Sequence, residues 1–228
     1  MILQDLFSLF FPDLCIGCKK ILLHQEKHLC ISCLHDLPLT KLHYSDSKLI
    51  SNIFYGHVVL EHATALFFFP KEGAIRQLIH QLKYKNQKDI SSYLGDWLGF
   101  ELRECNYFNE IDVIIPVPLH KSKLKSRGYN QVADFGKIIA KNLNATYNET
   151  SLIRIKNTTT QTMKDRINRL RYLDTIFEVS KCSSLQGKHI LLVDDVITTG
   201  ATIKACAKEL NKIPDIKISL AVMAYTDN

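Results

Sequence analysis

The stretch ILLVDDVITTGAT, residues 190–202, joins an apolar run to two acids and a turn rich in small residues. Four consecutive apolar residues, β-branched at Ile190 and Val193, are typical of a strand covered on both faces. We expect this strand to end at Asp194 and Asp195, both partly exposed, and a helix to span 203–210. Ligands of open α/β sheets bind at the carboxyl ends of strands, so the two acids mark a candidate site.

The residues after the two acids are typical of an anion site. Backbone N–H groups at a helix N-terminus bind phosphate, and a glycine lets the ligand approach the backbone closely. Two carboxylates beside such a turn suit a ligand with vicinal hydroxyls and a phosphate, such as a ribose 5-phosphate. The alternative, a threonine cap beside two solvated acids, explains neither the paired acids nor the small residues. The predicted phosphate loop consists of Thr198, Thr199, Gly200, Ala201 and Thr202.

This stretch resembles the phosphoribosyl pyrophosphate (PRPP) motif of type I phosphoribosyltransferases. The resemblance implies that Asp194 and Asp195 hold the ribose hydroxyls, that residues 198–202 surround the 5-phosphate, and that Mg²⁺ arrives with PRPP. P-loop ATPases also place two acids after an apolar strand. The Gly-x-x-x-x-Gly-Lys-Ser/Thr motif of those enzymes is absent from the sequence, which excludes that class.

Two Cys-x-x-Cys pairs, Cys15/Cys18 and Cys30/Cys33, are separated by eleven residues near the N-terminus. Each pair is typical of a tight turn that directs two thiolates to one tetrahedral zinc ion. We therefore predict a structural Zn²⁺ site at these four cysteines, in preference to two disulfides or a redox pair. Three histidines lie close enough in the sequence to replace a ligand: His24, His28 and His35.

The length and patterning of the chain predict one α/β domain with a small appendage. Its 228 residues are 46% hydrophobic, which suffices for a sizeable core. We expect a zinc-binding module over residues 1–45 and a phosphoribosyltransferase-like domain over 50–228. Alternating strands and helices predict a mostly parallel sheet with flanking helices. Besides 190–193, the predicted strands are 53–69 (as a pair), 111–117, 151–155, 176–179 and 216–225, and the predicted helices 74–84, 90–102, 132–143 and 203–210.

A second candidate ligand-binding segment begins with the sequence Pro-Val-Pro-Leu, residues 116–119, at the exit of a predicted strand. The prolines restrict this loop, and four cations follow it closely. Such a loop can bind pyrophosphate through backbone amides and side-chain charge. The alternative is a proline-rich bend with a solvated basic turn. The predicted pyrophosphate-loop residues are Pro118, Leu119 and Arg127.

In their order along the chain, these motifs are similar to those of the ComF family. The resemblance covers nearly the whole chain and rests on the cysteine pairs, residues 116–119, Arg-Gly-Tyr-Asn-Gln (127–131), Thr160-Gln161, Arg169, Phe177 and the two acids. It implies a cytosolic factor of natural transformation. Such a factor would handle incoming single-stranded DNA together with a ComF-type helicase or other DNA-processing proteins. Tyr172 is a departure, because the family usually has Asn there.

The charge of the chain is concentrated in residues 121–171. This segment holds 12 Lys and Arg against 3 Asp and Glu, whereas the whole chain has a net charge of only +6. A surplus this local predicts a polyanion site. Tyr84, Tyr129, Tyr147 and Tyr172 are candidates for stacking on bases. The predicted DNA-binding residues are Lys121, Lys123, Lys125, Arg127, Arg166, Arg169 and Arg171.

The first eleven residues are apolar, but Asp5 interrupts them and no basic residue precedes them, so we expect no signal peptide. No apolar run approaches the ~18 residues of a membrane span, and we predict a cytoplasmic protein. Three functions stay open. They are a DNA-handling protein with PRPP as ligand, an active phosphoribosyltransferase of unknown acceptor, and a zinc-stabilised adaptor with a vestigial PRPP site.

Overall fold

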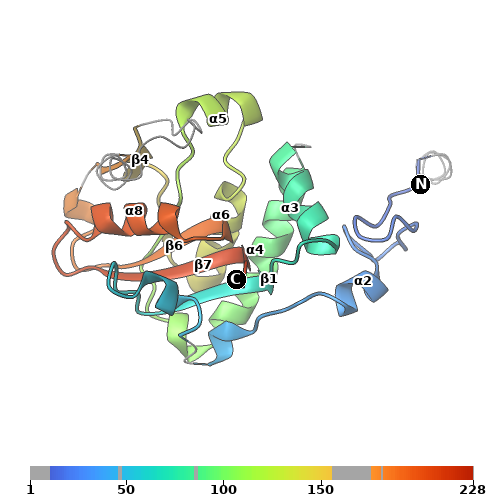
Figure 1. Cartoon of the computed structure of the whole chain (residues 1–228), viewed down its shortest axis with the longest axis horizontal. Helices are drawn as coiled ribbons and strands as arrows, with labels where there is room; N and C mark the ends of the chain where they lie inside the picture. Colours follow the sequence, from blue (N-terminus) through green and yellow to red (C-terminus); the bar gives the residue numbers. More distant parts are fainter. Residues whose placement is uncertain (1–10, 46–47, 85–86, 156–175, 181, 228) are drawn as a thin grey trace.

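The computed structural model describes residues 11–45, 48–84, 87–155, 176–180 and 182–227 (Figure 1). Its centre is a sheet of five strands in the order β1-β7-β6-β2-β3, and every neighbouring pair is parallel. The predicted fold class, a mostly parallel sheet with flanking helices, is confirmed. The strands are β1 (Ala63–Phe68), β2 (Val113–Pro116), β3 (Thr146–Tyr147), β6 (His189–Ile197) and β7 (Lys217–Tyr225).

Strand β6 is apolar throughout because each face of the sheet is covered. Leu191 and Val193 share one core with α3 (Ala74–Tyr84), α4 (Lys88–Arg103) and α6 (Ala133–Leu143). Ile190 and Leu192 point to the opposite face, where α8 (Ala201–Leu210) packs. A short antiparallel pair, β4 (Leu152–Arg154) and β5 (Phe177–Val179), also contributes to this second core. Both predicted short strands in this region are therefore present.

The predicted pair of strands over 53–69 is wrong in its first half. Only β1 forms there, and residues Ser51–Phe54 make a 3₁₀ helix, η2. Aromatic and β-branched residues favour burial as much as strand structure, and Phe54 is fully buried without pairing in the sheet. The outer edge of β1 is covered by residues 38–40, since the N–H of Phe68 donates to the carbonyl of Pro38 at 2.8 Å.

The N-terminal segment packs against one end of the main domain (Figure 1). It contains α2 (Ile31–His35), and its residues Ile16 and Leu29 belong to the same apolar core as α3 and α4. The His28 ring lies edge-on to Tyr93, and its Nε2 is 3.4 Å from a carboxylate oxygen of Asp89. The boundaries of a zinc module at 1–45 and a second domain at 50–228 stay predictions.

The remaining short elements connect these layers. A helix, α5 (Lys121–Arg127), follows β2, where the sequence predicted a loop. Within the described part of the chain, no helix has both the length and the apolar character that crossing a bilayer requires. Three further 3₁₀ helices are η1 (Leu42–Tyr44), η3 (Asn106–Phe108) and η4 (Cys182–Ser184).

Candidate functional site

The two acids lie near the carboxyl end of β6. The strand continues past them, because Val196 and Ile197 still pair with β7, so its predicted end at the acids is wrong. Asp194 is half-buried, and its Oδ1 accepts a hydrogen bond from the backbone N–H of Asp195 at 2.8 Å. Asp195 is only 7% exposed. The prediction that both acids are partly exposed is therefore wrong for Asp195, whose side chain points into the protein.

Asp195 is held by side chains from two distant segments. Lys83, in the last turn of α3, places its Nζ 2.9 Å from Oδ2 of Asp195. Gln131 donates from Nε2 to the same oxygen at 2.6 Å. Arg127, a predicted pyrophosphate-loop residue, donates to Oε1 of Gln131 at 2.9 Å and so lies one side chain away from the acid.

Lys83 and Gln131 were not among the predicted site residues. Gln131 belongs to the Arg-Gly-Tyr-Asn-Gln stretch that the family resemblance already singled out. Lys83 ends an amphipathic helix, and nothing in its local sequence pairs it with an acid more than one hundred residues later. Only the folded chain brings α3 and β6 together at this edge of the sheet.

The two acids lie in different surroundings. Burial and the neighbouring charge of Asp195 raise the pKa of Asp194 to about 8, although Lys83 and Arg154 partly oppose the shift. The protonated form of Asp194 is therefore favoured at neutral pH. Asp195 instead has the Nζ of Lys83 at hydrogen-bonding distance.

The predicted phosphate loop lies directly beside Asp194. Helix α8 begins at Ala201, two residues earlier than predicted, and Gly200 is its N-cap. The five loop residues and Asp194 line a small hollow of about 50 Å³ together with Val196, Ile197 and Ile203. A helix N-terminus facing such a hollow suits a phosphate, because its first N–H groups lack partners within the helix. The structure thus brings Asp194 and residues 198–202 together.

A glycine is required at position 200 for two reasons, its backbone conformation and the closeness of neighbouring side chains. Its φ is +70°, in the left-handed region, and an added Cβ would lie 2.9 Å from Cε1 of Phe54 and 3.1 Å from Cγ2 of Ile53. Phe54, from η2, therefore supports the phosphate loop from the buried side. No local pattern in the sequence predicts this contact between Phe54 and Gly200.

We expect Gly200→Ala to destabilise the protein more than Gly56→Ala does. Gly56 has nearly the same φ, +73°, but nothing lies within 4 Å of its added Cβ. The control therefore reports backbone strain alone, about 1 kcal/mol, and crowding against Phe54 adds about 1–3 kcal/mol for Gly200→Ala. Chemical denaturation of both variants measures the difference. Equal losses in the free energy of unfolding would show that Phe54 does not pack on the loop.

The predicted pyrophosphate segment leaves the sheet next to the acids. Residue Val117 donates its N–H to the carbonyl of Val193 at 2.9 Å, which places Pro118 and Leu119 beside the end of β6. Both are half-buried. The cations that follow are carried by α5, whose first turn is capped by the His120 side chain accepting from the N–H of Ser122.

Basic side chains gather around the acids. Lys121, Lys123 and Lys125 are exposed on α5. Partial burial and the nearby charges of Arg154, Arg127 and Lys83 lower the pKa of Lys123, which places these four cations in one neighbourhood. Three of the predicted DNA-binding residues lie outside the described part of the chain, namely Arg166, Arg169 and Arg171. Thr160, Gln161 and Tyr172 lie outside it as well.

Among the three described candidate tyrosines, Tyr84 presents an exposed ring. It is 67% exposed, and the guanidinium carbon of Arg127 lies 5.6 Å from its ring centroid. Tyr129 is half-buried and donates its hydroxyl to the carbonyl of Leu82. Tyr147 donates to Glu149 at 3.0 Å and packs against α6. Of these three tyrosines, Tyr84 is therefore the candidate whose exposed ring fits the predicted base stacking.

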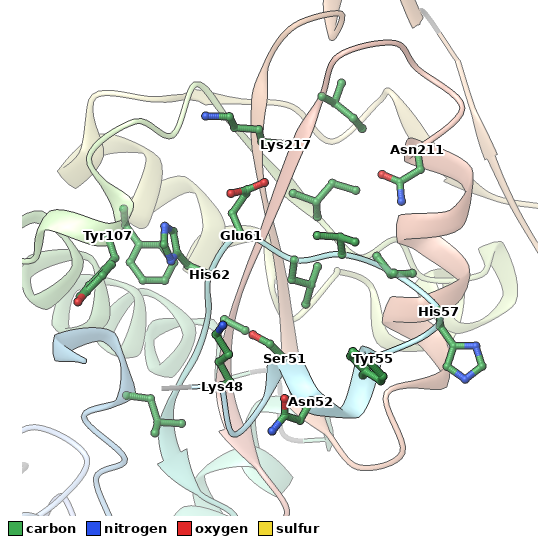
Figure 2. Close-up of a pocket in the computed structure, with 18 of the residues that line it drawn as sticks. Lys48, Ser51, Asn52, Tyr55, His57, Glu61, His62, Tyr107, Asn211 and Lys217 are labelled. Carbon is green, nitrogen blue, oxygen red and sulfur yellow. The ribbon is translucent and has the colours of Figure 1, made fainter. Parts of the chain in front are cut away.

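A cavity larger than the hollow beside Asp194 lies elsewhere, at the amino ends of β1 and β7 (Figure 2). It measures about 750 Å³ and has an apolar floor with a polar rim, in which Glu61 and Lys217 lie side by side and His62 lies next to Tyr107. The predicted site residues do not line it. Ligands of open α/β sheets bind at the carboxyl ends of strands, so the smaller hollow beside Asp194 is the candidate functional site.

The four predicted metal ligands lie together. The sulfur atoms of Cys15, Cys18, Cys30 and Cys33 are all within 4.8 Å of one another, and the four are free thiols. Cys18 and Cys30 have their sulfurs 3.6 Å apart. Zn–S bonds of about 2.3 Å in a tetrahedron place sulfurs about 3.8 Å apart. The cluster could therefore hold one metal ion, and its geometry fits zinc.

The chemistry of the cluster also favours a metal. Burial opposes ionisation of Cys15, yet the backbone N–H groups of Cys18 and Cys30 lower its pKa to about 6. A thiolate is the form that binds zinc. Gly17 makes room for the cluster, because an added Cβ would lie 2.9 Å from Sγ of Cys33. His28 contacts Asp89 and Tyr93. Among the described residues, the four cysteines alone form the cluster.

Comparison with known proteins agrees with this arrangement. The family described as Phosphoribosyl transferase domain matches residues 132–227, which include both acids and the phosphate loop. Competence protein ComFC of Bacillus subtilis is 35% identical over 199 residues, covering 86% of this chain and 78% of that protein. The chain belongs to the ComF family.

Other relatives match over a shorter stretch. Competence protein F of Haemophilus influenzae is 32% identical over 142 residues, 60% of this chain and 61% of that protein. DNA utilization protein YhgH of Escherichia coli O157:H7 is 32% identical over 136 residues, 58% of this ComF-family chain and 59% of the relative. The chain thus spans about three fifths of these two relatives.

Among solved structures, an adenine phosphoribosyltransferase matches with a TM-score of 0.42 and 18% identity, over 79% of this chain and 91% of that one. The glutamine PRPP amidotransferase of B. subtilis, complexed with ADP and GMP, matches with a TM-score of 0.43 and 16% identity. It covers 62% of this chain and 30% of that one.

Proposed function

We propose that this protein is a cytoplasmic competence factor that handles incoming single-stranded DNA during natural transformation and binds PRPP in its phosphoribosyltransferase-like domain. Membership of the ComF family supports the competence role. One observation carries the ligand assignment: Asp194 and the Thr198–Thr202 loop line one hollow at the carboxyl end of β6, and the backbone N–H of Asp195 donates to Asp194. That arrangement suits a ribose diol beside a phosphate.

The parts of PRPP can be assigned to parts of this site. Residues 198–202 would bind the 5-phosphate, the two acids would bind the ribose hydroxyls, and Pro118, Leu119 and Arg127 would lie next to the pyrophosphate. Mg²⁺ would arrive with PRPP and offset the pyrophosphate charge. The role of the protein's own residues is to position the sugar and to surround its phosphates with N–H groups and cations.

An active phosphoribosyltransferase is the second candidate function. It is favoured by the cations Lys123, Arg127 and Arg154, which lie in the neighbourhood of the acids. In that reaction the bond between C1 and the pyrophosphate oxygen breaks, and the electron pair leaves with pyrophosphate. Cations that already surround the leaving group would stabilise its charge. Pyrophosphate release from PRPP, assayed with and without single-stranded DNA, distinguishes turnover from binding alone.

We propose that DNA binds to α5 and the residues around it. Lys121, Lys123 and Lys125 project from this helix, and the exposed ring of Tyr84 lies next to Arg127. A strand would place its phosphates on the lysines and one base on the tyrosine. Stacking of this kind favours single strands and is tolerant of sequence, at about 1–3 kcal/mol per base.

Charge reversal on α5 tests this assignment. If about 4 phosphates are neutralised, the logarithm of the affinity falls with the logarithm of salt concentration with a slope near −3. Lys123→Glu with Lys125→Glu should weaken binding at least tenfold for every sequence tested, because phosphate contacts carry no sequence information. Fluorescence anisotropy with a labelled oligonucleotide measures both effects.

A matched control reverses two charges at the opposite edge of the sheet, Lys48→Glu with Lys217→Glu, both on the rim of the large cavity (Figure 2). This variant has the same net charge as the α5 variant, and we expect it to keep nearly the wild-type affinity. Equal losses in the two variants would show that net charge alone governs binding. An affinity that responds neither to salt nor to charge reversal on α5 would contradict DNA binding at this surface.

A further inference from the structure

The ion pair between Lys83 and Asp195 differs from an ordinary surface salt bridge. Asp195 is 7% exposed, and the Lys83 side chain is 23% exposed. Exposed pairs contribute little, whereas a buried carboxylate depends on its partner to remain charged. The pair joins two elements that are distant in the sequence, α3 and β6, so it is a tertiary contact and not one within a helix or turn.

The position of Lys83 is fixed by its surroundings. Residues Ile75, Leu78, Ile79 and Leu82 bury one face of α3 in the core. The carbonyl of Leu82 accepts the hydroxyl of Tyr129, which ties the last turn of the helix to the segment after α5. Lys83 therefore reaches Asp195 from a rigid support, as a positioning residue must.

Both partners of Asp195 act on one oxygen atom. Lys83 lies 2.9 Å and Gln131 lies 2.6 Å from Oδ2. The backbone N–H of Asp195 donates to Asp194, which restrains the two acids relative to each other. Both side chains contact Oδ2, so Oδ1 of Asp195 is the oxygen that the proposal below assigns to a ligand hydroxyl.

We propose that Lys83 is a specificity-determining positioning residue that holds Asp195 oriented toward a ribose hydroxyl, so that the site rejects deoxyribose phosphates. This inference rests on the proposed sugar-phosphate site. An acceptor that is held in place gains a hydrogen bond from a hydroxyl and is left unpaired by a sugar that lacks it. DNA bound to the adjacent basic surface would then not occupy the site with its own deoxyribose.

The test compares ribose 5-phosphate with its 2-deoxy and 3-deoxy analogues in calorimetric titrations of the full chain. A site built to bind a hydroxyl can reject the analogue that lacks it by up to about 10⁴-fold, and we expect the wild type to prefer ribose 5-phosphate about 100-fold over at least one analogue. Lys83→Met and Lys83→Gln should reduce that preference to below about tenfold, because Asp195 loses the side chain that holds its carboxylate in place.

Two further variants distinguish a loss of sugar specificity from a general structural effect of the substitution. Lys83→Arg retains the positive charge and should retain most of the preference. Lys88→Met removes a neighbouring exposed cation, whose Nζ lies 5.1 Å from the centroid of the Tyr129 ring, and should leave the preference unchanged. Since the readout is a ratio of affinities within one variant, a general loss of folded protein does not alter it.

The outcomes are distinct. A preference that survives in both Lys83→Met and Lys83→Gln overturns the inference and leaves the proposed function standing. Wild-type protein that binds neither ribose 5-phosphate nor PRPP contradicts the proposed function itself. Loss of preference in those two variants, with retention in Lys83→Arg and Lys88→Met, supports the role of Lys83.

Discussion

Protein purified without added metal is expected to carry one zinc ion per chain, and replacing Cys15 and Cys30 by serine is expected to abolish it and to unfold the N-terminal module. Apart from buried apolar residues such as Ile16 and Leu29, which pack in the core of the main domain, the module has few other sources of stability. Its helix α2 spans only Ile31–His35 and contains no buried residue. Structural zinc supplies about 10–16 kcal/mol of apparent binding free energy, which in such modules is folding free energy.

Metal analysis and limited proteolysis measure the two parts of this prediction. Zinc content should fall from one per chain to none, and cleavage should appear within residues 11–45 while the sheet domain stays resistant. Cys105→Ser is the matched control, because Cys105 is buried outside the cluster and its thiol donates to the carbonyl of Leu102. Equal zinc content in the wild type and the double variant would rule the site out.

Replacing both acids, Asp194→Asn with Asp195→Asn, is expected to lower PRPP affinity at least 100-fold while the protein stays folded. Two carboxyl groups that accept from the ribose hydroxyls become amides, whose single oxygen is a weaker acceptor. The stability cost is small at Asp194, because burial already disfavours its charged form. The matched control is Asp96→Asn, an exposed acid on α4 that does not line the hollow beside Asp194.

The pH dependence of stability checks the same site independently of any ligand. The pKa of Asp194 is raised from 3.8 to about 8, so its protonated form is favoured in the folded protein. Wild-type stability should therefore fall as the pH rises between these two values, relative to Asp194→Asn, which cannot ionise. Denaturation at pH 5 and pH 8 measures the difference.

For the double variant Asp194→Asn with Asp195→Asn, undiminished PRPP affinity would contradict the role of the two acids in binding the ribose.

Much of the fold could be predicted because its signals are local. The apolar run before Asp194, the helical spacing over 74–84 and the alternation of strands and helices each follow from neighbouring residues. The cysteine cluster could be predicted for the same reason, since each Cys-x-x-Cys turn is a local motif and only the pairing of the two turns requires the fold.

The missed features depend on contacts between distant segments. Lys83 reaches Asp195 only because α3 packs beside β6, and Phe54 supports Gly200 only because η2 folds against the start of α8. Burial of Asp195 escaped prediction because an acid at a strand end is usually solvated. Here Lys83 and Gln131 replace the solvent, so a buried acid can be tolerated.

One chain of this ComF-family protein is expected to bind PRPP at Asp194 and Asp195 and single-stranded DNA at a separate surface. A calorimetric titration of the full chain with PRPP and Mg²⁺, first alone and then with a saturating single-stranded oligonucleotide, measures both sites together. One PRPP should bind per chain in both titrations. Absence of PRPP binding in both would show that the chain has no such site.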